Sequence, residues 1–183
     1  GYYDLFDAQK AYKKLLFRAG KGLQSRELNE MQEAMRHELR QCIDGLCGNG
    51  KLMRGGNILI SGDQARLGES VIWVSGYAVD VPAATLIIST VGLCTIGVAV
   101  LSVVKAEDDD GSLRDPAVNT RNYNEPGAAR LQVTGRWALD SDVLAADEEF
   151  YPIYELMDGV LQATIVPDSD LDGAMKLLAR YDL

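Results

Sequence analysis

The chain has 183 residues, which is enough for one domain or two small ones. Its 47% hydrophobic and 25% charged residues are ordinary for a soluble globular protein. A net charge of −9, with no run of Lys or Arg, excludes the basic face that a nucleic-acid binder needs.

The first 20 residues alternate aromatic and basic side chains without a clean period, which predicts an extended arm with at most one helical turn. The segment has neither the basic nor the apolar region of a secretory signal. Such an arm either lies against a neighbouring subunit or folds on its own domain. Its aromatic residues are the candidates for partner docking: Tyr2, Tyr3, Phe6, Tyr12 and Phe17.

Residues 25–46 have the clearest helical periodicity in the chain, with apolar residues at spacings of 3, 4, 4, 3 and 4. Ser25 is the expected N-cap, and the glycines from Gly45 onward are expected to end the helix. A narrow stripe of this kind packs on one or two partner helices or on the helix's own domain. We call these residues the apolar stripe and identify them as the candidate oligomer interface: Leu28, Met31, Met35, Leu39, Cys42 and Leu46.

A β-rich body is expected next. The predicted strands are 57–61, 69–74, 77–81, 85–89 and 94–105. Residues 86–104 lack charge over a length that a membrane helix needs, but 10 of these 19 residues are Ile, Val or Thr. We therefore predict two buried strands joined by a turn near residues 89–92, and no membrane insertion.

A polar loop is expected up to about Gly127, followed by an amphipathic strand at 129–137 with Leu131, Val133 and Trp137 on one face. Strands at 150–157 and 160–165 flank Asp158-Gly159, a dipeptide typical of hairpins. A short helix capped by Asp168 or Ser169 should follow; its apolar residues are Leu171, Met175 and Leu178.

The predicted fold class is therefore α+β, with an N-terminal arm, a long helix, a sandwich-like or barrel-like β body and a short C-terminal helix. We predict an attachment and oligomerisation region at 1–50 and a β-rich domain at 51–183. The chain is expected to continue into a longer C-terminal region after Leu183.

Several motifs resemble chemical sites without completing them. Residues 45–52 approach a phosphate-binding loop, but Leu52 replaces the required hydroxyl and the segment follows a helix. Residues 168–173 match half of a calcium loop, but Ala179 stands where the bidentate acid belongs. His37, Cys42 and Cys47 are spaced five apart on different helix faces, which disfavours zinc. We predict no catalytic residue, cofactor or metal.

The cysteines Cys42, Cys47 and Cys94 form an odd and sparse set, which argues against a disulfide-stapled secreted fold. Whether any of them bridges two chains stays open.

One long pattern and several shorter ones resemble a family of phage virion domains, found near the N-terminus of tail-fibre and baseplate-associated proteins of tailed phages. The motifs occur in order over most of the chain: YYDLFD (2–7), LFRAG (16–20), LQSRELNE (23–30), VPAAT (81–85), SLRDPAVNTRNYNEPGAARL (112–131), FYPIY (150–154) and LARYD (178–182).

The resemblance implies a structural virion protein, the N-terminal anchoring region of a tail fibre or fibre adaptor on the phage baseplate. It implies no catalytic residues. With the apolar stripe, it favours a homotrimer assembled in the host cytoplasm, with baseplate and tail-fibre proteins as partners.

The main alternative is a host-glycan-binding module or a virion-associated depolymerase, because Trp73, Trp137 and the tyrosines could stack on sugars. A depolymerase also needs two convergent acids, and the sequence singles out no such pair. A third alternative is a soluble regulator that shares parts of the pattern.

Overall fold

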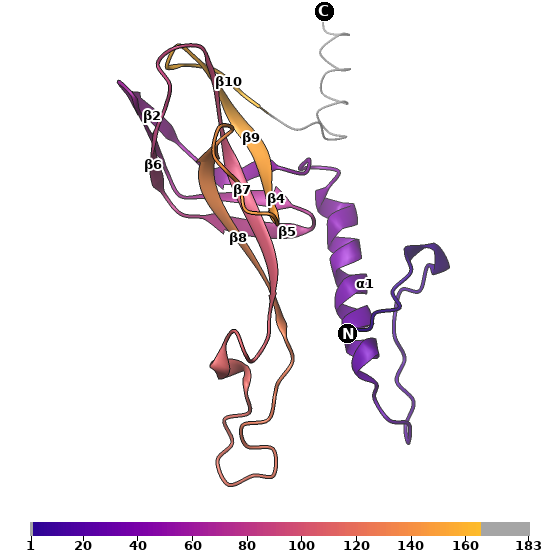
Figure 1. The fold of residues 1–183 in the computed structure, drawn as a ribbon. Helices are drawn as coiled ribbons and strands as arrows, with labels where there is room; N and C mark the ends of the chain where they lie inside the picture. Colours follow the sequence, from indigo (N-terminus) through magenta and orange to yellow (C-terminus); the bar gives the residue numbers. More distant parts are fainter. Residues whose placement is uncertain (1, 166–183) are drawn as a thin grey trace, which may run out of the picture. The chain divides into compact units, whose positions relative to one another are not determined.

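The computed structural model describes residues 2–165, which fall into two compact units (Figure 1). The helical unit contains residues 2–49 together with the turn Val74–Gly76. The β unit contains Gly50–Trp73 and residues 77–165. Each unit is described by itself below.

The helical unit has one α-helix, α1 (Ser25–Ile43), and one 3-10 turn, η1 (Ala8–Lys10). The N-cap is Gln24 and not Ser25, and the Gln24 N–H donates to the Glu27 carboxylate over 2.9 Å. The Glu27 carboxylate in the first turn thus satisfies the free backbone amide of the N-cap residue, as the acid of a capping box does. The helix ends before Leu46, because the Leu46 and Cys47 amides both turn back to the Ile43 carbonyl.

The β unit consists of three antiparallel sheets. The first has the order β1 (Lys51–Gly55), β4 (Ser70–Val74), β5 (Tyr77–Val81). The second has the order β2 (Ile58–Ser61), β3 (Gln64–Leu67), β6 (Ala84–Ile87). The third has the order β10 (Val160–Thr164), β9 (Glu148–Met157), β7 (Leu93–Lys105), β8 (Arg130–Leu139).

The predicted α+β class is wrong: the described chain is β-rich, with strands in three sheets and one α-helix. The strands also do not close a single sandwich or barrel. Two strands that we did not expect, β1 and β3, account for much of the difference. The predicted C-terminal helix with Leu171, Met175 and Leu178 lies outside the described residues.

The core of the β unit is built largely from aliphatic side chains, among them Ile72, Ile96 and Leu156, which are fully buried. Trp137 stacks near Tyr154 with 6.2 Å between ring centroids. The Trp137 indole N–H donates to the Gly68 carbonyl over 3.2 Å, and the Tyr154 hydroxyl donates to the Gly56 carbonyl. The two large polar rings are thus buried with their donors satisfied.

The hairpin predicted at Asp158-Gly159 is confirmed, since β9 pairs with β10 across it. Both residues have positive φ, 50° and 74°, as a two-residue hairpin turn of the primed type requires. The Asp158 carboxylate also accepts from the Gly92 N–H over 2.7 Å, which ties this turn to the start of β7.

The uncharged stretch 86–104 forms two strands, as predicted: β6 ends at Ile87 and β7 begins at Leu93. The prediction that both are buried is confirmed only for part of β7, because no residue of β6 is buried. Within residues 2–165, no helix combines the length and the apolar character that crossing a bilayer requires.

Strands β7 and β8 continue beyond the end of β9 as a two-stranded ribbon, and a loop at 106–129 joins them (Figure 1). The loop is ordered by its own contacts, including a bridge between Arg114 and Pro126 and reciprocal backbone bonds that link Asp115 to Glu125 and Asn124.

Candidate functional site

The apolar stripe lies uncovered on α1. None of the 19 residues of this helix is buried in the described chain, although a helix of this kind gains most of its stability from packing its apolar face. Met35 is 68% exposed and Leu39 49% exposed, and Cys42 is exposed as well. Leu28 and Met31 are about two-fifths exposed, and Leu46, just past the helix end, is 56% exposed. The six predicted interface residues therefore form an open apolar surface.

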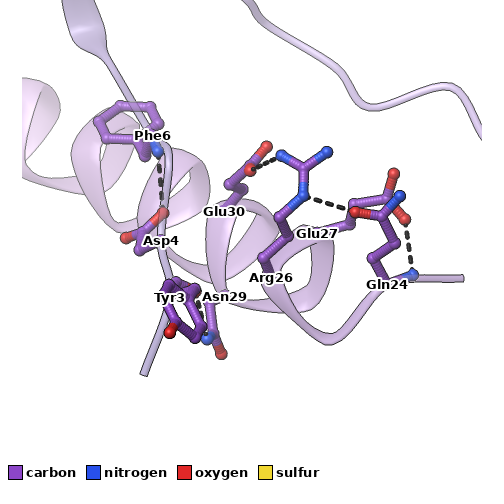
Figure 2. A network of polar contacts seen from close by, with 8 residues as sticks. All are labelled: Tyr3, Asp4, Phe6, Gln24, Arg26, Glu27, Asn29 and Glu30. Carbon is purple, nitrogen blue, oxygen red and sulfur yellow. Dashed lines mark hydrogen bonds and ion pairs between the residues drawn. The ribbon is translucent and has the colours of Figure 1, made fainter. Parts of the chain in front are cut away.

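A different face of α1 is occupied by the N-terminal arm of the same chain. The Asn29 side-chain amide donates to the Tyr3 carbonyl over 2.8 Å, as Figure 2 shows. The Phe6 ring lies 5.4 Å from the His37 ring, and Lys13 pairs with Glu38 at 3.3 Å. Of the two alternatives for the arm, the structure therefore contains the one in which it folds on its own helix.

Most of the aromatic rings on that arm are nevertheless exposed. Tyr2, Tyr3 and Tyr12 are at least 70% exposed and Phe17 is 55% exposed, whereas Phe6 is half-buried. The arm is fixed through its backbone and Phe6, so four of the five predicted docking residues present free aromatic surface.

The polar residues of α1 are held by local pairs on the remaining faces. The Arg26 guanidinium bridges the Gln24 side chain at 2.6 Å and the Glu30 carboxylate at 3.1 Å (Figure 2). Arg36 pairs with Glu33 over 2.5 Å. The Arg26 contacts stabilise the start of the helix, and all of these charged residues lie off the apolar stripe.

A groove of about 790 Å³ opens between the arm segment 15–24 and the first turns of α1. Its apolar walls come from Leu16, Phe17 and Leu23 on the arm and from Leu28 and Met31 on the helix. Sequence reasoning singled out only Phe17 on this arm segment. The two leucines that line the groove with it, Leu16 and Leu23, are 77% and 59% exposed, and no periodic pattern in the sequence marks them.

The thiols lie in three different environments. All three cysteines are free; Cys42 is on the open stripe, Cys47 is half-buried after the helix and Cys94 is buried in β7. Burial raises the pKa of the Cys94 thiol, which makes it a poor nucleophile. Cys42 alone is placed where a second chain can reach it through the stripe.

The segments that resemble metal-binding or phosphate-binding motifs do not form such a site in the described part of the chain. His37 contacts Phe6, and within residues 2–165 no group of three or more His, Cys, Asp or Glu side chains is arranged to hold a metal. Residues 45–51 form the helix end and the turn into β1, as expected for a helix cap. The calcium-like segment at 168–173 lies outside the described residues.

The tryptophans cannot serve as sugar-stacking platforms. Trp73 and Trp137 are each only 3% exposed, so their ring faces are covered by the core of the β unit. The part of the glycan-binding alternative that rested on these two residues is therefore wrong.

The comparisons with known proteins give a family and distant similarities to solved structures, two of which are described here. No curated protein sequence matches the chain. A chain of the baseplate complex from the type VI secretion system is 12% identical with a TM-score of 0.46; the match covers 92% of this protein and 64% of that chain. The crystal structure of TssK gives 12% identity and a TM-score of 0.36, covering 81% of this protein and 40% of that chain.

Both TM-scores are below 0.5, so neither similarity carries a functional argument. The family model, in contrast, matches residues 1–183, the whole of the sequence. The chain therefore belongs to the family described as Domain of unknown function (DUF4815).

Proposed function

We propose that this chain is a structural virion protein that anchors a tail fibre, or a fibre adaptor, to a phage baseplate. The observation that carries the proposal is the apolar stripe of α1, which is exposed along the whole helix. Contiguous exposed apolar surface rimmed by polar residues marks an interaction site. The ordered virion-like motifs at 2–30 and 112–131 support the choice of particle and partner.

In this proposal the stripe mediates self-association as a homotrimer, and the exposed arm aromatics contact baseplate or fibre proteins. Aromatic residues with free ring faces are enriched at the centres of protein interfaces, because they bury a large area at a small entropic cost. The protein would act by positioning its partners in the virion, without catalysis.

The stripe is tested by Met35→Asp. Met35 is 68% exposed, so the substitution costs the isolated chain little, whereas burying an unpaired carboxylate in an interface costs about 3 kcal/mol or more. We expect light scattering to give a trimer mass for the wild type and a monomer mass for Met35→Asp. Gln41→Asp, an exposed change on the same helix but off the stripe, is the matched control and should stay trimeric.

Docking is tested separately, by pull-down of baseplate and tail-fibre proteins with the wild type and with a Tyr2→Ser/Tyr3→Ser/Tyr12→Ser variant. We expect the triple change to reduce capture while leaving the mass of the oligomer unchanged. A wild-type monomer that captures none of these proteins would contradict the proposal. Specific binding in a glycan array, or polysaccharide cleavage by this chain, would instead favour the glycan-binding or depolymerase alternative.

A further inference from the structure

The C-terminal half of the apolar stripe is open at the end of α1 that leads into the β unit. Its three residues, Leu39, Cys42 and Leu46, are all exposed. No residue of the helix is buried in the described chain, although a helix gains most of its stability from packing an apolar face. A segment that covers these three residues would therefore stabilise α1 by removing apolar surface from water.

Residues 166–183, which lie outside the described residues, contain an apolar pattern that needs such a surface. Leu171, Met175 and Leu178 lie 4 and 3 residues apart, which predicts one apolar face on a helix of about 14 residues. A helix this short is marginal in water by itself, so it requires a partner surface. The stripe has the same spacing when it is read backwards from Leu46, 4 and then 3 residues.

The described structure fixes the point from which this segment starts. The Ile165 N–H donates to the Ile153 carbonyl of β9 over 2.7 Å, so the chain leaves the β unit beside this residue. The chain from α1 enters the β unit at Gly50, where an added Cβ would lie 2.7 Å from the Tyr151 ring of the same strand. Tyr151 and Ile153 are two residues apart, which is about 7 Å along a strand. The two chain segments therefore join the β unit close to each other.

Short linkers then connect this part of the β unit to both apolar surfaces. Residues 44–49 lead from the end of α1 to the β unit, and residues 166–170 lead from the β unit to Leu171. Because α1 ends toward this junction and the segment begins at it, the segment follows α1 most directly in the antiparallel direction. Its three apolar residues then meet the stripe in the order Leu46, Cys42, Leu39.

We propose that residues 168–183 pack antiparallel on the C-terminal half of the apolar stripe of the same chain. The contact goes beyond the proposed function, because it gives the stripe a second occupant that self-association must displace. Leu28 and Met31 stay open in this arrangement, so a second copy can begin to bind there. Self-association uses all six stripe residues and the segment covers three, so self-association prevails at sufficient protein concentration.

The reactivity of Cys42 reports this contact. In a Cys47→Ser background Cys94 stays buried, so a fluorescent maleimide labels Cys42. The measurement is made at a dilution where sedimentation gives a monomer mass. We expect labelling about 10-fold faster in Leu171→Asp/Leu178→Asp than in the background, because two unpaired carboxylates cannot be buried against the stripe.

Arg180→Asp in the same background is the matched control. Residue 180 lies opposite the apolar face at roughly 100° per residue, and the change adds the same negative charge as the two leucine substitutions together. Labelling of Cys42 should stay slow in this variant. The double variant alone should also self-associate at a lower concentration than the background in a light-scattering dilution series, because its stripe is open.

A disulfide tests the antiparallel direction without disrupting the contact. In the Cys47→Ser background, the thiol introduced by Met175→Cys should meet Cys42 of the same chain. Mild oxidation with diamide would then join the two thiols into one disulfide as the diamide is reduced. We expect loss of both thiols in a chain that stays monomeric on a non-reducing gel, and no such loss with Arg180→Cys.

The outcomes separate this inference from the proposed function. Equal labelling rates in the double variant and the background would overturn the inference and leave self-association intact. Slow labelling that becomes fast on further dilution would also overturn it, because the segment would then lie on a neighbouring chain. If Cys42 is protected and both the background and the double variant are monomeric at every concentration, the inference stands and the proposed trimer is contradicted.

Discussion

Arg136 and Glu148 form an ion pair across β7 with a definite pH signature. The Arg136 guanidinium donates two hydrogen bonds of 2.9 Å to the Glu148 carboxylate, which also accepts from the Ala145 N–H over 3.0 Å. The Arg136 bonds first, and the Ala145 amide second, hold the pKa of Glu148 at about 2, below its ordinary value of 4.5. Glu148 is mostly covered, whereas Arg136 is 44% exposed, so solvent screens the pair in part.

The stability that Glu148 provides should therefore disappear in acid. A carboxylate whose pKa is lower in the folded chain stabilises the fold above pH 4.5, and this contribution is lost as the pH falls through about 2. We expect Glu148→Gln to lower the free energy of unfolding by about 1 kcal/mol near neutral pH. The difference from wild type, measured by urea unfolding, should shrink steadily below pH 4.5. If the difference in unfolding free energy does not change with pH, the Glu148 side chain contributes through packing and not through its charge.

Gly97 is a second residue whose role follows from local geometry. A Cβ at this position of β7 would lie 2.3 Å from the Tyr151 carbonyl oxygen and 2.5 Å from the Phe150 ring, where the β7–β9 register shifts. Both neighbours belong to β9 and cannot move independently of the sheet. We expect Gly97→Ala to destabilise the β unit by about 1–3 kcal/mol in thermal or urea unfolding. Gly111→Ala, where a Cβ has open space, is the control and should have little effect.

At the scale of elements, periodicity was informative wherever one face of an element is apolar. The helix start at Ser25, strands β4 to β10 and the Asp158-Gly159 turn follow from alternation, 3.6-residue spacing and turn chemistry. The residues at which helices and strands begin and end were harder to predict. The cap moved to Gln24 because the Glu27 side chain reaches back to its amide, a contact that propensity alone does not reveal.

The two missed strands have a common physical cause. Residues in β3, Gln64–Leu67, have good helix propensity and only two buried positions, Ala65 and Leu67. β1 is an edge strand with no buried residue and ends in Gly55, whose φ is 71°. In both cases the pairing partner determines the conformation: β1 pairs with β4, which is distant in sequence, and β3 pairs with β2 across residues 62–63 although its own residues favour a helix. This is why the α+β prediction underestimated the number of sheets.

At the scale of the whole chain, only part of the candidate site could be predicted from the sequence. The apolar stripe was identified from spacing, and the structure adds that it is uncovered in the described chain. The groove formed with Leu16 and Leu23 was not predictable, because it depends on where an aperiodic arm crosses the helix. The burial of Trp73 and Trp137 likewise needed the sheets to be in place, and it removes the residues that best suited a sugar site.

The arm has a consequence for limited proteolysis. Residues 12–18 belong to no helix, strand or turn, and the side chains of Lys13, Lys14 and Arg18 there are exposed. The loop at 106–129 also contains a trypsin site, Arg121. Turns and the bridge between Arg114 and Pro126 constrain this loop, so it does not readily adopt the extended conformation that a protease active site binds.

Trypsin should therefore cleave the free chain first at Lys14 or Arg18, and at Arg121 only later, as mass spectrometry of the fragments would record. When the chain assembles through the stripe, we expect the arm beside α1 to become less accessible, so the early cut should slow while the rate at Arg121 stays the same. Met35→Asp should restore the early cut. The order of two peptide-bond cleavages thus becomes a readout of assembly that needs no identified partner.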